Sequence, residues 1–129
     1  MKPLGFASEY VYSFSRAIVG FLFLAHGLQK LFGVLGAEQA VALFSQLGLA
    51  GLIELFTGTL VMLGFYTPVV AFLASGHMAA AYLLAHGPRG FWPIMNGGEL
   101  AVLYCFVFLY FSTRGSGPLS LDRILRGRS

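Results

Sequence analysis

Apolar residues run through this chain in four long stretches that carry no polar face. They cover about Tyr10–Phe32, Leu49–Tyr66, Pro68–His86 and Gly97–Thr113. A helix that faces water needs a polar side, so helices apolar all round are typical of a membrane or a deep core. Crossing the hydrocarbon layer takes roughly 20 apolar residues in a helix. Because lipid leaves backbone groups without partners, helices are favoured over isolated strands. The pattern predicts an all-α integral membrane four-helix bundle, with residues 1–129 in a single domain.

Composition strengthens this prediction. Hydrophobic residues make up 57% of the chain and charged residues 10%, whereas soluble domains carry about 25% charged residues. The mean hydropathy is +0.79. The first stretch is too long for the core of a cleaved signal peptide, and three more apolar stretches follow it. We therefore expect it to remain as the first membrane span.

The basic residues predict an orientation. Lysine and arginine in short loops favour the cytoplasmic side. One side of the bundle would carry both chain ends with Lys2, Arg114, Arg123, Arg126 and Arg128, and the other only Lys30 and Arg89. We expect a multi-pass protein of the cell inner membrane with both termini cytoplasmic. The net charge of +3 then indicates attraction to anionic membrane lipids, not binding of nucleic acid.

The connecting segments carry weaker signals. Between Gly36 and Gly48, one helical face of apolar residues predicts a short helix on the outer surface. Residues 87–93 are too broken for a helix, and Trp92 suits the membrane interface. That loop is expected either to fold over the outer end of the bundle or to form a simple anchored turn. Residues 120–126 are expected to form a short amphipathic helix.

Helical spacing predicts close packing of the first two spans. At about 100° per residue, one stripe of the first span contains Arg16, Gly20, Phe23, Gly27 and Lys30. A narrow face of the second span contains Gly51, Glu54 and Gly58. Small residues let membrane helices approach closely. We expect these faces to meet, with Lys30 paired to Glu54 or Glu99.

Polar residues gather toward one side of the predicted membrane layer. Ionisable groups at membrane depth are costly and tend to line a site or pathway. Several have ordinary explanations: Glu99 suits a helix start, Lys30 can extend to the surface, and His77 suits a packing role. Glu54 is harder to explain this way, because a buried acid near a glycine face needs a cation or a proton. The members of this set are His26, Gln29, Lys30, Glu54, His86 and Glu99.

Several chemistries are disfavoured. Cys105 is the one cysteine, and dithiol exchange needs two. The Glu-x-x-His pair of di-iron bundles is missing, as are phosphate-binding and hydrolase motifs. His26 and His86 are the histidines expected at a common depth, but we expect no metal or haem. A wide pore would require several copies of the chain.

A cavity with imidazole, carboxylate and ammonium groups among apolar walls suits an amphipathic, lipid-soluble ligand. A quinone head group has carbonyl oxygens that accept hydrogen bonds, and its reduction consumes protons that histidine or glutamate could relay. A lipid head group would also suit such a cavity. Catalytic residues are not predicted; the candidate ligand-binding residues are His26, Gln29, Lys30, Glu54, Trp92 and Glu99.

Three motifs together resemble the DoxX family of four-helix membrane proteins. They are FLAHGLQKLFG at residues 23–33, GLIE at 51–54 continuing through Gly58 to LGFYTP at 63–68, and NGGELA at 96–101 with Leu103-Tyr104. The likeness extends from about Phe14 to Asp122. The motifs are specific in combination and weak singly.

The resemblance implies a redox-linked membrane subunit, since the family is distantly similar to a subunit of a thiosulfate:quinone oxidoreductase. It supports His26, Lys30, Glu54 and Glu99 as the family-type polar set, a quinone as ligand, and a partner in a redox complex or a homo-oligomer. The alternative is a non-catalytic membrane anchor or a lipid-binding subunit of a larger complex. A transporter would instead be an oligomer with Glu54 or Glu99 beside a shared water path.

Overall fold

The computed structural model of the chain describes residues 1–37 and 39–128, and all regular structure in these residues is helical. Four long helices carry the fold: α1 (Ser8–Phe32), α2 (Gln46–Leu63), α3 (Thr67–Ala81) and α5 (Glu99–Arg114). Five short elements connect or flank them. These are η1 (Gly5–Ala7), the π-helical turn η2 (Tyr82–His86), η3 (Gly87–Arg89), α4 (Pro93–Asn96) and α6 (Leu121–Arg126). The predicted all-α bundle is confirmed.

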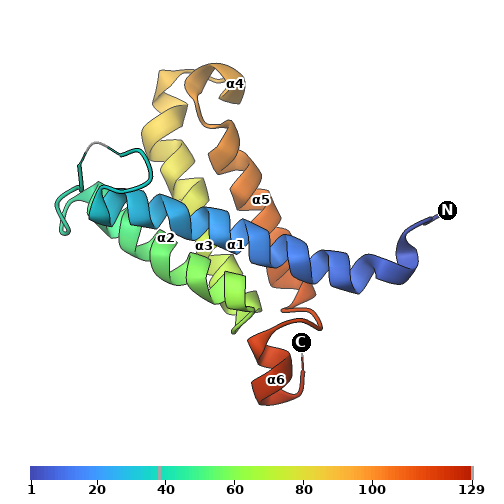
Figure 1. The fold of residues 1–129 in the computed structure, drawn as a ribbon. Helices are drawn as coiled ribbons and strands as arrows, with labels where there is room; N and C mark the ends of the chain where they lie inside the picture. Colours follow the sequence, from blue (N-terminus) through green and yellow to red (C-terminus); the bar gives the residue numbers. More distant parts are fainter. Residues whose placement is uncertain (38, 129) are drawn as a thin grey trace.

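The four long helices form two antiparallel pairs (Figure 1). Helix α1 lies along α2, and α3 lies along α5. Helix α3 also packs against α2, so the second pair crosses the first. Toward the end that carries η2 and α4, the α3–α5 pair diverges from the α1–α2 pair. The candidate site lies in this divergence.

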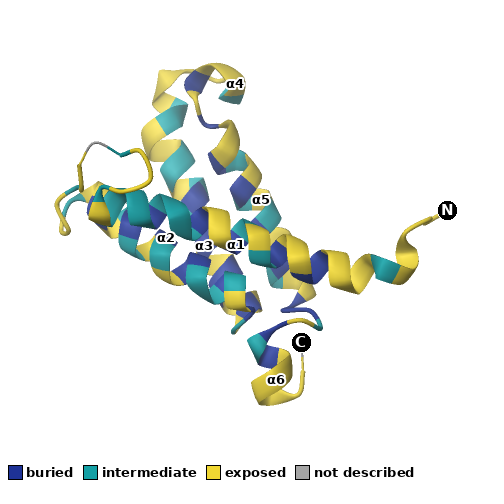
Figure 2. Ribbon diagram, viewed as in Figure 1, coloured by how far each residue is buried: buried dark blue, intermediate teal, exposed yellow. Residues whose placement is uncertain are grey.

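Among the residues that the structure describes, three helical segments are long and apolar enough to cross a membrane: Gly5–Phe32, Gln46–Leu63 and Thr67–Arg89. Helix α5 has 16 residues, which at ~1.5 Å per residue spans less than the ~30 Å hydrocarbon layer. Buried residues concentrate where the helices meet, and the outward faces are exposed (Figure 2). Many outward residues are large and apolar, including Phe14, Phe72 and Phe106. Such a surface suits lipid and confirms a membrane protein.

Glycines set the close approach of α1 and α2, as the helical spacing predicted. A methyl group added to Gly27 would lie 2.7 Å from the carbonyl oxygen of Gly51. One added to Gly20 would lie 2.8 Å from the carbonyl oxygen of Gly58. Because side chains larger than hydrogen cannot fit, the two backbones come into direct contact. This contact brings Lys30 beside α2.

The structure differs from the sequence-based expectations in the connecting segments and at the beginning of α2. Helix α2 begins at Gln46, where the Ser45 hydroxyl accepts a hydrogen bond from the Gly48 N–H, rather than at Leu49. The short surface helix expected between Gly36 and Gly48 is missing from the described residues there. The third span runs to His86 as predicted, with the π-helical turn η2 as its last turn. The segment after it, predicted to be too broken for a helix, contains the short elements η3 and α4. The Ser45 cap thus sets the beginning of α2 three residues before the apolar run.

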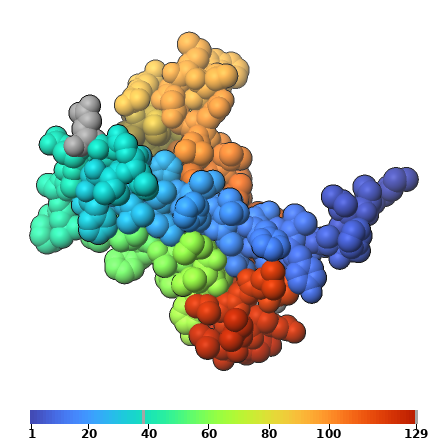
Figure 3. All heavy atoms as spheres, viewed as in Figure 1, coloured from blue at the N-terminus to red at the C-terminus, as the bar shows by residue number. Residues whose placement is uncertain are grey.

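The C-terminal segment is tied to the helix ends by a buried arginine. Arg16 is 2% exposed, and its Nε donates to the Val61 carbonyl at 2.9 Å. Its Nη atoms donate to the carbonyls of Ser116 and Leu119. The guanidinium thus satisfies its donors with backbone carbonyls of α2 and of the segment after α5. Figure 3 shows this C-terminal segment against the end of α2.

Asp122 completes this connection. Its carboxylate accepts the Tyr66 backbone N–H at 3.0 and 3.1 Å and the Ser116 hydroxyl at 2.5 Å, while its own N–H donates to the Gly64 carbonyl. Burial alone would raise the pKa of Asp122, but these hydrogen bonds and the Arg126 cation hold that pKa below its ordinary value of 3.8. We call this group of Arg16, Ser116 and Asp122 the C-terminal clamp.

Candidate functional site

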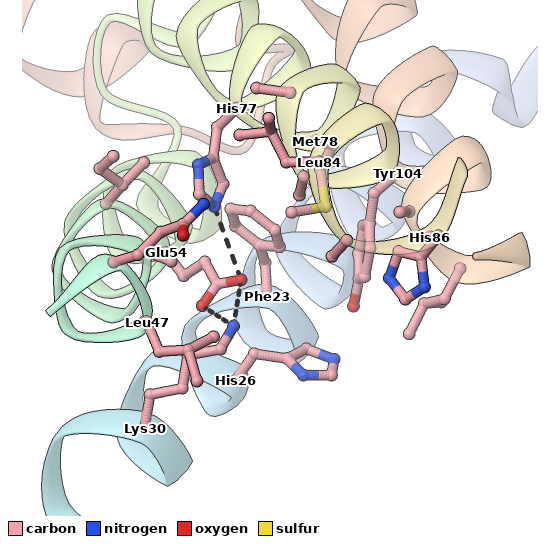
Figure 4. Close-up of a pocket in the computed structure, with 18 of the residues that line it drawn as sticks. Phe23, His26, Lys30, Leu47, Glu54, His77, Met78, Leu84, His86 and Tyr104 are labelled. Atoms are coloured by element: carbon pink, nitrogen blue, oxygen red, sulfur yellow. Dashed lines mark hydrogen bonds and ion pairs between the residues drawn. The ribbon is translucent and has the colours of Figure 1, made fainter. Parts of the chain in front are cut away.

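A cavity of about 710 Å³ opens between the two helix pairs. Its walls come from the last turns of α1, the first half of α2, the end of α3 with η2, and the beginning of α5. Most lining residues are apolar (Figure 4). The polar and aromatic residues among them are Phe23, His26, Lys30, Gln46, Glu54, His77, His86 and Tyr104.

Glu54 and Lys30 form an ion pair on one wall. The Lys30 Nζ lies 2.7 Å from Oε1 and 2.5 Å from Oε2 of Glu54. The side chain of Glu54 is 4% exposed and that of Lys30 27%. The lysine therefore extends from the end of α1 toward the surface while neutralising a carboxylate inside α2. Of the two acids considered as partners for Lys30, the structure selects Glu54.

His77 of α3 lies beside the same carboxylate. Its Nε2 is 3.7 Å from Oε1 of Glu54, too long for a hydrogen bond. This nitrogen is sealed from solvent and has no hydrogen-bond partner among the described residues. Lys30, Glu54 and His77 thus form a series across three helices (Figure 4).

A second polar group lies on the other side of Phe23. The Phe23 ring centroid is 6.3 Å from that of His77 and 5.0 Å from that of Tyr104. The rings of His26 and Tyr104 meet edge to face at 6.0 Å. The cavity therefore has polar groups on two sides of an aromatic core, which is suited to a ring with oxygen atoms at two positions.

The turn after α3 is held in place by Asn96. Its side-chain nitrogen donates to the Tyr82 hydroxyl at 3.0 Å and to the Gly90 carbonyl at 2.9 Å. Gly98 packs so tightly here that an added methyl group would lie 2.7 Å from the Tyr82 ring. These contacts fix η2, from which His86 reaches the cavity. Single π-helical turns occur often at functional sites.

Of the six residues predicted to bind a ligand, three line the cavity and three do not. His26, Lys30 and Glu54 line the cavity together. Gln29 does not line it and donates to the Leu35 carbonyl at 2.7 Å. Glu99 and Trp92 are exposed and line a second hollow of about 690 Å³ against α4 and α5. Helix α5 pairs with α3, and Glu99 is not among the residues that line the cavity with Lys30.

Sequence reasoning assigned His77 a packing role and did not mention Tyr104 as a site residue. The usable signal for His77 was its place as an ionisable residue in the middle of an apolar span. Its neighbour Glu54 belongs to another helix, and only the helix pairing brings them together. Tyr104 carried no separate signal, because tyrosines are common in such spans.

The donor groups do not assemble a metal site in the part of the chain that the structure describes, where no group of three or more His, Cys, Asp or Glu side chains is suitably placed. His26 and His86 both line the cavity. His86 Nδ1 lies 3.3 Å from the Asn96 carbonyl oxygen, and this contact orients its ring. The arrangement offers hydrogen bonds and charge to a ligand.

Comparison with known proteins places the chain among membrane proteins. The DoxX family model matches residues 12–87. An uncharacterized protein of Haemophilus influenzae is 40% identical over 120 residues, which cover 88% of this chain and 89% of the relative. An uncharacterized membrane protein of Mycobacterium tuberculosis is 31% identical over 135 positions, covering 88% and 80% respectively. No solved structure matches the chain.

Proposed function

This chain belongs to the DoxX family, and from that premise we propose that it binds a quinone-like, lipid-soluble molecule between its two helix pairs as a subunit of a membrane redox system. The observation that carries this proposal is the cavity itself, with the Lys30–Glu54–His77 series on one side and His26 and Tyr104 on the other. Glu99, Trp92 and Gln29 are not part of the proposed contact surface.

The size and chemistry of the cavity support this ligand class. Pockets for small molecules measure roughly 300–1,000 Å³ and combine apolar walls with a few polar groups, and this cavity of about 710 Å³ lies within that range. Its lining residues Leu47, Leu49 and Leu84 are themselves strongly exposed. An apolar tail could leave past them into lipid while a polar ring stays inside.

The proposed setting is the cell inner membrane, with both termini cytoplasmic and the cavity toward the outer face. Electrons would come from a partner protein, because the chain itself offers one cysteine, Cys105, and no second thiol. Binding and positioning of the ligand are the roles we assign to this chain. A partner in a redox complex, or a second copy of the chain, would complete the system.

A second candidate is a non-catalytic anchor or lipid-binding subunit. The close Lys30–Glu54 pair favours it, since this contact joins α1 to α2 whether or not a ligand is present. The two candidate functions differ in whether they require an open cavity. An anchor tolerates a filled cavity, whereas a quinone-binding subunit does not.

The test is to fill the cavity without removing a charge. Ala81→Phe places a ring at the cavity wall, and Leu73→Phe places one on the outward face of the same helix as its control. Binding of a short-chain quinone would be measured by calorimetry in lipid nanodiscs, against protein-free nanodiscs. We expect Ala81→Phe to lower affinity by about tenfold or more and Leu73→Phe to leave it unchanged.

His26→Ala tests the polar contacts in the same assay. It should weaken quinone binding while the thermal unfolding temperature of the bundle changes little, because the His26 ring lies at the cavity. If wild-type protein fails to bind the quinone, or Ala81→Phe binds as tightly as wild type, the anchor role replaces the quinone-binding role. Purification in mild detergent would then identify the protein that is anchored.

A further inference from the structure

The two ring nitrogens of His77 differ in their surroundings. Nε2 faces Oε1 of Glu54 at 3.7 Å and is closed off from solvent. Nδ1 makes no hydrogen bond to any residue that the structure describes, and the His77 side chain lines the cavity. One nitrogen thus faces a protein carboxylate, while Nδ1 is not among the sealed atoms of this partly exposed side chain that lines the cavity.

The Lys30–Glu54 pair determines which nitrogen of His77 carries the hydrogen. The Lys30 ammonium only donates, and at 2.5 and 2.7 Å it stabilises Glu54 as a carboxylate. An ionised carboxylate offers only lone pairs, so a lone pair on Nε2 facing it would be repelled. A ring of His77 with a single N–H therefore carries that hydrogen on Nε2, and Nδ1 is left as a hydrogen-bond acceptor.

We propose that His77 makes this cavity selective for the hydroxyl form of its ligand: a quinol or a related phenol, whose O–H donates to Nδ1. A quinone carbonyl can only accept, so it would face the lone pair of Nδ1 without a hydrogen bond. The inference rests on the proposed function, because it concerns the same cavity. The other titratable groups that line it are His26, Lys30, Glu54, His86 and Tyr104.

The series also predicts how to reverse the selectivity. In Glu54→Gln, Lys30 remains a donor and would hold the oxygen of the new amide. The NH2 group of that amide would then face Nε2 of His77, which must become the acceptor. The hydrogen of the ring would move to Nδ1, and the cavity would prefer a carbonyl over a hydroxyl.

The experiment compares two ligands that differ in whether the phenolic oxygen carries a hydrogen or a methyl group. 4-Decylphenol donates a hydrogen bond, and its methyl ether 4-decylanisole does not. Affinities would be measured in nanodiscs, corrected for partition into protein-free nanodiscs. We expect wild type to prefer the phenol by about 3- to 10-fold, the ratio that one net hydrogen bond gives. His77→Leu should abolish the preference, and Glu54→Gln should abolish or reverse it.

Gly76→Ala is the matched control. Gly76 precedes His77 in α3, and a methyl group added there would have no atom within 4 Å, so the preference should persist. Nitrogen-15 NMR of the His77 ring gives a second readout that a merely structural role would not move. The wild-type spectrum should show hydrogen on Nε2, and that of Glu54→Gln should show it on Nδ1.

The outcomes separate this inference from the function on which it rests. If both ligands bind wild type equally, or His77→Leu keeps the preference, the selectivity of His77 is disproved while the cavity remains a binding site. Hydrogen on Nδ1 in wild type would also disprove it. If neither ligand nor a short-chain quinone binds, the proposed function fails and the inference fails with it.

Discussion

Glu54 takes part in both the packing of the bundle and its candidate site. The residue is 3% exposed, contacts Lys30 from α1 and lies beside His77 from α3. Withdrawing an ionised carboxylate from water costs several kcal/mol, and a close cation offsets part of that cost. The ion pair therefore allows a charged, hydrogen-bonding group to remain inside an apolar bundle.

Breaking this pair from either side should destabilise the protein more than removing it entirely. Lys30→Met leaves a buried carboxylate unpaired and should cost about 3–5 kcal/mol. Glu54→Gln leaves the more exposed lysine and should cost less. The double variant should be more stable than Lys30→Met alone, because neither charge remains. Thermal unfolding in detergent measures all four proteins; additive losses would show that the two side chains do not stabilise each other.

Asp122 contributes to the stability of the folded protein by an amount that depends on pH. It lies in α6, outside the membrane spans, and its pKa is held below the ordinary value of 3.8. A group with a lowered pKa in the folded state binds protons more readily when unfolded. Its contribution is therefore complete above that ordinary value and is lost as pH falls through the folded-state pKa.

Asp122→Asn should remove this part of the pH dependence. The variant should unfold at a lower temperature than wild type at neutral pH, because the Ser116 hydroxyl and the Tyr66 N–H lose a charged acceptor. The difference should narrow as the pH is lowered below 3.8. A constant difference across the acid range would show that Asp122 is not ionised in the clamp.

At the level of helices, the sequence predicted where each helix lies along the chain better than which helices pack against each other. Apolar runs located four long helices, and glycine spacing predicted the contact of α1 with α2. Both signals are local, because they depend on residues within one helix. The pairing of α5 with α3 depends on the whole fold, so Glu99 was expected as a candidate partner of Lys30, and His77 was expected to have only a packing role.

The glycine contact can be tested directly. Gly27→Ala should push α1 from α2, since the added methyl group would lie 2.7 Å from the Gly51 carbonyl oxygen and the Leu55 nitrogen. Overpacking of this kind costs about 1–3 kcal/mol, so the unfolding temperature should fall. Gly76→Ala adds the same methyl group in open space and should have little effect. Equal stability of the two variants would argue against a close α1–α2 contact.

At the scale of the whole molecule, the two ends of the bundle differ in their chemistry. The end with the C-terminal clamp also holds Arg114 paired to Glu9 at 2.6 Å, so the beginning of α1 and the end of α5 lie together. The opposite end holds the cavity, η2 and α4 (Figure 1). A basic end and a cavity end on opposite sides imply a defined orientation in the membrane.

Arginine placement predicts that the clamp end faces the cytoplasm, because basic loops are retained there. Phe91 and Arg128 are both exposed and lie near opposite ends of the bundle. In a background with Cys105→Ser, Phe91→Cys should react with a membrane-impermeant maleimide added to intact cells. Arg128→Cys should react only after the cells are opened, which also controls for its accessibility. Labelling of Arg128→Cys in intact cells, with Phe91→Cys protected, would place the cavity toward the cytoplasm, and any ligand would then exchange protons with that compartment.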